Sequence, residues 1–135
     1  MTICAGFGAP VGFHFYAFYD NGPVALGWLP TSGMGDGIQF WILPSTRGLE
    51  TSVQQRQYTL EDRTDRWLQI MGPAGEDGLD LAQDARALVS HLTDAGRLEH
   101  TFAPGRGGYL YVIDGRLSLN DDQLRTGDAA TITGE

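Results

Sequence analysis

The sequence predicts a fold built almost entirely of β-strands. Nineteen of the 135 residues are glycine, about twice the average usage, which favours an architecture with many turns. Short alternating apolar runs are separated by turn signals along residues 107–128, where Asp114-Gly115 separates two of the runs. Asp-Gly in such a context is typical of a β-hairpin whose two turn residues both have positive φ. We therefore predict a meander of short strands in this stretch.

The register of the predicted hairpin gives it two different faces. A two-residue turn places Val112 opposite Leu117 and Leu110 opposite Leu119, and directly opposed residues share a face. We expect this aliphatic face to point into the core. The opposite face could border solvent, a second layer or a partner, and it carries Tyr109, Tyr111 and Ile113. Further turns are expected at residues 120–122 and 127–128, with residues 129–133 following the second.

The rest of the chain shows weaker strand signals. Aromatic, β-branched and other apolar runs bounded by turn residues predict strands at residues 13–19, 24–29, 38–43, 67–71 and 98–102. The first two flank the turn at residues 20–23 and can form a hairpin. Residues 47–66 are polar and follow neither period, so they predict an extended connector.

Residues 79–92 give conflicting signals. Apolar residues such as Leu81, Ala85, Leu88 and Leu92 recur at helical spacing, and Asp80 and Gly96 could cap the two ends. Taken alone, this spacing predicts a helix. The meander that follows favours strands instead.

Charge and composition exclude several classes of function. The formal net charge is −8, so the field of the whole molecule repels nucleic acid. Cys4 is the only cysteine, which rules out an intrachain disulfide and a cysteine-rich metal site. No apolar stretch has the length of a membrane span, and no basic segment precedes the first apolar residues. We therefore expect a cytoplasmic protein without a nucleic-acid or membrane partner.

Two groups of motifs resemble those of pirin-like proteins, which belong to the cupin superfamily. Gln39-Phe40-Trp41-Ile42-Leu43-Pro44, with Arg47-Gly48 and Gln54-Gln55-Arg56-Gln57, resembles the segment that joins the first cupin barrel to the second. Asp77-Gly78, Gln83-Asp84, Tyr111-Val112-Ile113-Asp114-Gly115 and Gly127-Asp128 are similar to the opening strands of the second cupin. The resemblance implies strands over residues 79–92.

The resemblance also implies how the single domain, residues 1–135, is organised. Residues 1–37 are unmatched, residues 38–72 form the crossover segment, and residues 79–135 form a C-terminal cupin that is cut short. We expect a partial cupin-like β-sandwich or barrel, completed by N-terminal strands or by a partner chain. Residues 13–29 could replace the lost strands. Unpaired strand edges then predict a homodimer or higher homo-oligomer, with Tyr109, Tyr111 and Ile113 at the interface.

The residues at the expected ligand positions argue against a metal. The resemblance implies a catalytic metal in the first cupin, but residues 1–37 contain no such histidine motif. The general cupin pattern, counted back from Gly115, puts ligand positions at Phe102, Pro104 and Gly108, and none of these can bind a metal. The remaining histidines, His14, His91 and His100, show no ligand spacing. We expect no metal or other cofactor and assign no catalytic residue.

The most economical function is a non-catalytic assembly or small-molecule-binding module. A small apolar or aromatic ligand is expected to bind between the sheets, near His100, Phe102 and Leu110. The resemblance also implies two alternatives. One is a metal-dependent flavonol (quercetin) dioxygenase, and the other is a transcriptional cofactor that works through protein contacts.

Overall fold

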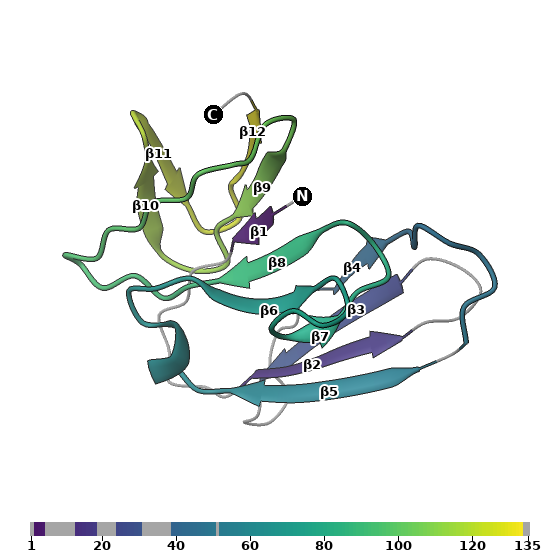
Figure 1. Cartoon of the computed structure of the whole chain (residues 1–135). Helices are drawn as coiled ribbons and strands as arrows, with labels where there is room; N and C mark the ends of the chain where they lie inside the picture. Colours follow the sequence, from purple (N-terminus) through teal and green to yellow (C-terminus); the bar gives the residue numbers. More distant parts are fainter. Residues whose placement is uncertain (1, 5–12, 19–23, 31–38, 51, 134–135) are drawn as a thin grey trace.

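The computed structural model describes residues 2–4, 13–18, 24–30, 39–50 and 52–133, and nearly all regular structure in them is β-strand (Figure 1). This confirms the predicted all-β fold. The strands are β1 (Thr2–Cys4), β2 (Phe13–Phe18), β3 (Val24–Pro30), β4 (Gln39–Ile42), β5 (Val53–Tyr58), β6 (Leu68–Gly72), β7 (Leu79–Asp80), β8 (Arg86–Val89), β9 (Gly107–Tyr111), β10 (Arg116–Leu119), β11 (Asp122–Arg125) and β12 (Ala129–Thr133). The 3-10 helix η1 (Glu61–Arg63) lies between β5 and β6. No helix in these ranges is long and apolar enough to cross a membrane.

The strands form two main sheets and a separate hairpin. The larger sheet has the order β12-β9-β1-β8-β6-β7, the smaller has the order β4-β3-β2-β5, and β10 pairs with β11. In Figure 1 the smaller sheet lies beneath β6, β7 and β8, whereas β9 to β12 rise at the other end of the molecule. The predicted N-terminal hairpin is confirmed, because β2 and β3 pair antiparallel.

The main core fills the space between the two sheets. Ile42 of β4 and Tyr58 of β5 pack in one cluster with buried residues of the larger sheet and the segment after β7. Those partners are Ile70, Met71, Leu79, Leu81, Ala85, Ala87 and Val89. Burial of such apolar side chains is the main favourable term in folding, so this cluster holds the two sheets together.

A second core cluster lies under the C-terminal strands. Leu110 and Val112 are buried, with exposed fractions of 7% and 1%. The half-buried side chains packed against them are Trp67, Leu117, Leu119, Leu124 and Ile132. The aliphatic face predicted from the sequence is therefore confirmed.

The predicted turn at Asp114-Gly115 is wrong, because β9 pairs with β12 and not with β10. The chain reverses instead at residues 120–121, where Asn120 has φ 52°. Tyr111 pairs with Ala129, and further along the hairpin Arg116 pairs with Arg125. Between these two pairs, the first arm of the hairpin advances by five residues and the second arm by four.

On the second arm, the Gly127 amide donates to the Val112 carbonyl oxygen and the Val112 amide donates to the Asp128 carbonyl oxygen, so Gly127, with φ 87°, and Asp128 form a β-bulge opposite Val112. On the first arm, residues 113 and 114 lie between Val112 and Gly115, whose carbonyl oxygen accepts from the Thr126 amide. Residues 107–133 thus form one long hairpin with a bend in the middle.

Residues 79–92 contain a pair of strands, β7 and β8, as the resemblance implied, and not the helix that the apolar spacing predicts. β8 lies in the middle of the larger sheet, where β6 and β1 hydrogen-bond to its two edges. Its residues Ala87, Leu88 and Val89 are all buried. Because both faces of β8 are covered, Leu88 and Val89 are buried next to each other. Together with the buried Leu81 and Ala85 of the preceding segment, they match a helical spacing by coincidence.

Two other expectations need correction. The polar connector contains strand β5, whose residues are mostly exposed at the edge of the smaller sheet. An edge strand is held by backbone pairing, so its side chains need not alternate. Residues 98–102 form no strand but cross the molecule without ladder bonds.

Candidate functional site

Three aromatic side chains meet where residues 97–103 cross the molecule. The Trp67 indole Nε1 donates a hydrogen bond to the carbonyl oxygen of Glu99 at 3.0 Å. The His100 ring lies edge-on to Phe102, with ring centroids 4.6 Å apart and an angle of 71° between planes. Trp67 and His100 are 6.2 Å apart at 79°. Edge-to-face packing is a favoured geometry for aromatic pairs, so the three rings fix this segment against the sheet.

Phe102 lies directly over the backbone of β9. A Cβ atom placed on Gly108 would come within 2.5 Å of Phe102 Cζ and 3.0 Å of Cε1. Position 108 therefore has to be glycine while the ring is there. Leu110, two residues along the same face, is buried in the second core cluster with Trp67. The structure thus places the three predicted ligand-binding residues, His100, Phe102 and Leu110, around one part of β9, with His100 exposed and Phe102 half-buried.

The residues at the cupin ligand positions do not fit a metal. Phe102, Pro104 and Gly108 offer no side-chain nitrogen, oxygen or sulfur, and the phenyl ring takes the space over Gly108. Elsewhere in the described ranges, no three histidine, cysteine, aspartate or glutamate side chains come together as metal ligands. His91 and His100 therefore belong to no such group, and for His14 only the backbone is described.

A polar cluster lies on the loop between β6 and β7 and on the start of β8. Glu76 pairs with Arg86 and also accepts a hydrogen bond from Gln69 Nε2 at 3.1 Å. These two donors hold the pKa of the Glu76 carboxyl below its usual range, Arg86 having the larger effect. Asp84 pairs with Arg106, which likewise lowers the pKa of that carboxyl. Each acid has a basic partner, so the cluster is suited to fixing loops and not to acid or base catalysis.

Arg63 and His91 join helix η1 to the end of β8. The Arg63 carbonyl oxygen accepts hydrogen bonds from the His91 backbone at 2.8 Å and from Ser90 Oγ at 3.3 Å. The Arg63 side chain is fully buried, and burial lowers the pKa of its guanidinium to about 10. The buried Nδ1 atom of His91 has no hydrogen-bond partner among the described residues. Ser90 Oγ is committed to a carbonyl, so Ser90 and His91 do not form a nucleophile and base pair.

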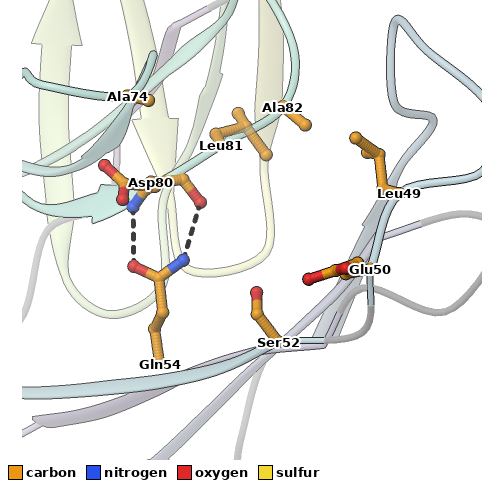
Figure 2. Close-up of a pocket in the computed structure, with 8 residues that line it drawn as sticks. All are labelled: Leu49, Glu50, Ser52, Gln54, Ala74, Asp80, Leu81 and Ala82. Carbon is orange, nitrogen blue, oxygen red and sulfur yellow. Dashed lines mark hydrogen bonds between the residues drawn. The ribbon is translucent and has the colours of Figure 1, made fainter.

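A shallow hollow of about 220 Å³ opens between the edges of the two sheets (Figure 2). The Gln54 side chain of β5 crosses the hollow and forms two hydrogen bonds with the backbone of Asp80 in β7. The Asp80 amide donates to Gln54 Oε1 at 2.9 Å, and Gln54 Nε2 donates to the Asp80 carbonyl oxygen at 3.2 Å. The hollow is lined by Leu49, Glu50, Ser52, Gln54, Ala74, Asp80, Leu81 and Ala82. None of the predicted ligand-binding residues lines it, and no signal in the polar run around Gln54 pointed to it.

The three predicted interface residues have different surroundings. Tyr109 is 41% exposed and Tyr111 is half-buried. Ile113 is half-buried and packs against the main core cluster.

Comparisons with known proteins agree with this architecture. Residues 69–135 match the family described as the quercetinase C-terminal cupin domain. A Zymomonas mobilis protein named "Putative quercetin 2,3-dioxygenase" is 28% identical over 95 residues, covering 69% of this chain and 40% of that protein. The chain thus corresponds to less than half the length of this relative. No solved structure matches it. Residues 69–135 belong to the pirin-like family, as part of its C-terminal cupin domain.

Proposed function

We propose that the protein is a non-catalytic module that binds a small aromatic molecule beside Trp67, His100 and Phe102. The observation that carries this proposal is the position of Phe102, whose ring covers Gly108 where a cupin would hold its metal ligands. An aromatic surface in place of metal ligands favours stacking and apolar contact over Lewis-acid chemistry. His100, exposed at the edge of the cluster, adds a group that can hydrogen-bond to a polar substituent.

The relative's name suggests the first probe. Quercetin is a flat polyphenol, so its rings can stack on aromatic side chains while its hydroxyls bond to His100. We expect titration calorimetry with quercetin under nitrogen to show saturable binding. Phe102→Ala and His100→Ala should each weaken it about tenfold, as expected for losing roughly 1.4 kcal/mol of contact.

Thr101→Ala is the matched control, because Thr101 is exposed and lies between the two aromatic residues. It should leave the affinity unchanged. The absence of saturable binding to the wild-type protein would contradict the proposal, and so would equal affinities for all three variants.

A flavonol dioxygenase is the second candidate, and the name of the Zymomonas mobilis relative supports it. It requires a metal that the residues at positions 102, 104 and 108 do not bind. Elemental analysis of the purified protein distinguishes the two functions. Stoichiometric iron, nickel, copper or zinc, together with oxygen uptake that depends on quercetin, would establish the dioxygenase and overturn the binding module.

A further inference from the structure

The outer edge of β12 is a sheet edge to which another strand can hydrogen-bond. β12 is the last strand of the larger sheet, and no strand in the described ranges pairs with its outer side. Its five residues are Ala129, Ala130, Thr131, Ile132 and Thr133. Proteins usually protect such an edge with charged residues, proline or a bulge. β12 has none of these.

The direction of the backbone groups shows which residues form this edge. The Val112 amide donates to the Asp128 carbonyl oxygen at 2.9 Å, so this carbonyl group points toward the first arm of the hairpin. Backbone groups alternate in direction along an antiparallel strand, so those of residues 130 and 132 also point toward β9. A Cβ on Gly107 would lie 2.7 Å from the Ile132 carbonyl oxygen, which confirms that this oxygen points toward β9. The amide and carbonyl groups of residues 129, 131 and 133 therefore point outward.

We propose that the partner at this edge is a second copy of the chain, paired antiparallel through β12 about a two-fold axis at Thr131. This register sets Thr131 opposite its own copy and Ala129 opposite Thr133 of the other chain. Every residue whose backbone amide and carbonyl groups point outward then lies opposite another such residue of the second copy. A two-fold contact requires such self-complementarity, and this strand meets the requirement without any shift.

The charge of the molecule restricts where a second copy can bind. Two copies with a formal net charge of −8 each repel one another, so they can only join through an uncharged surface. The face around the edge is uncharged: Thr131 lies beside Tyr109 and Ala129 beside Tyr111. In the dimer, Tyr109 and Thr131 of both chains form one ladder across four strands. Ile113 takes no part, because it packs against the main core cluster.

Sedimentation velocity of the full chain at micromolar concentration tests the dimer. Thr131→Lys places two ammonium groups directly opposite each other across the two-fold axis and should raise the dissociation constant at least tenfold. Ala95→Lys is the control with the same change of charge, on an exposed turn, and should not raise it. A monomeric wild-type protein would overturn the proposal, as would equal dissociation of the two lysine variants.

Cysteine cross-linking tests the register with smaller substitutions. Directly opposed residues have Cα atoms about 5.5 Å apart, which a disulfide can span. Under mild oxidation Thr131→Cys should give a covalent dimer, and the wild-type protein, with Cys4 alone, should not. Ala129→Cys and Thr133→Cys should cross-link only when the two variants are mixed. Cross-linking of all three variants by themselves, or of none in any combination, would exclude this pairing.

Discussion

Two glycines in the loop after β6 share a left-handed backbone but differ in their surroundings. Gly75 has φ 89° and a Cβ there would meet nothing within 4 Å. Gly78 has φ 95°, and its Cβ would come within 2.6 Å of the Met71 amide nitrogen and 2.5 Å of the Ile70 carbonyl oxygen. These are backbone atoms of strand β6, so moving them would disturb the sheet, whereas a flexible side chain could turn aside at little cost in free energy.

We therefore expect the two alanine substitutions to have different costs. Gly75→Ala should lower the free energy of unfolding by about 1 kcal/mol, the cost of a side chain in the left-handed region. Gly78→Ala adds a clash with β6 and should cost about 3 kcal/mol or more. Urea unfolding of both variants measures the difference. Equal losses would mean that the loop does not press against Ile70 as the structure shows.

Asp65 gives a prediction that depends on pH. The Thr93 amide and hydroxyl donate to its carboxylate at 2.8 and 2.7 Å, and these two bonds lower the pKa of the Asp65 carboxyl below its usual value of 3.8. A depressed pKa means that the folded state binds the proton less readily than the unfolded state. The carboxylate thus stabilises the fold above pH 3.8, and this contribution is lost as the pH falls below that value.

Asp65→Asn should isolate this effect, because asparagine also tolerates the φ of 51° at this position. The variant should unfold at lower urea concentration than the wild type at pH 7. The gap between the two midpoints should close as the pH falls below about 4, where carboxylates become protonated. A gap that stays constant down to pH 2 would show that the charge of Asp65 contributes nothing.

At the scale of elements, the sequence was most informative about which face of each strand is buried and least informative about which strands pair. The aliphatic face of Leu110, Val112, Leu117 and Leu119 is found as predicted, although the predicted pairing of its two strands is wrong. Apolar alternation shows only which side of a strand is buried, and a tight turn or an irregular stretch between Val112 and Leu117 produces the same faces. The aromatic cluster was predicted only in part, because residues 98–102 are fixed by the Trp67 side chain and by the Phe102 ring over Gly108, and not by a ladder.

The position of the hairpin turn can be tested with valine, which strongly disfavours positive φ. Of Asp114 and Asn120, only Asn120 has a positive φ. Asn120→Val should therefore cost about 1–2 kcal/mol, whereas Asn120→Gly and Asp114→Val should each cost clearly less. Thermal unfolding of the three variants gives the comparison. A larger loss for Asp114→Val than for Asn120→Val would restore the turn predicted from Asp-Gly.

At the scale of the whole molecule, the smaller sheet covers only part of the larger one. The main core cluster draws its members from β4 to β8 and the adjoining segments, and β9 and β12 contribute none. Their outward face, with Tyr109 exposed at 41%, continues the larger sheet beyond the covered region. This is why an additional strand from another copy can extend the sheet without disturbing either core.

Salt should strengthen this dimer, because the contact is uncharged while the molecules that carry it are strongly acidic. The Debye length falls from about 30 Å at 0.01 M to about 10 Å at 0.1 M ionic strength, so added NaCl screens the repulsion between two copies of charge −8. We expect the dissociation constant to fall several-fold over this range, and sedimentation velocity at the two salt concentrations measures it. A dimer held by ion pairs would respond in the opposite direction and dissociate as salt is added. The sign of the salt effect therefore separates pairing through β12 from any contact that uses the charged surface.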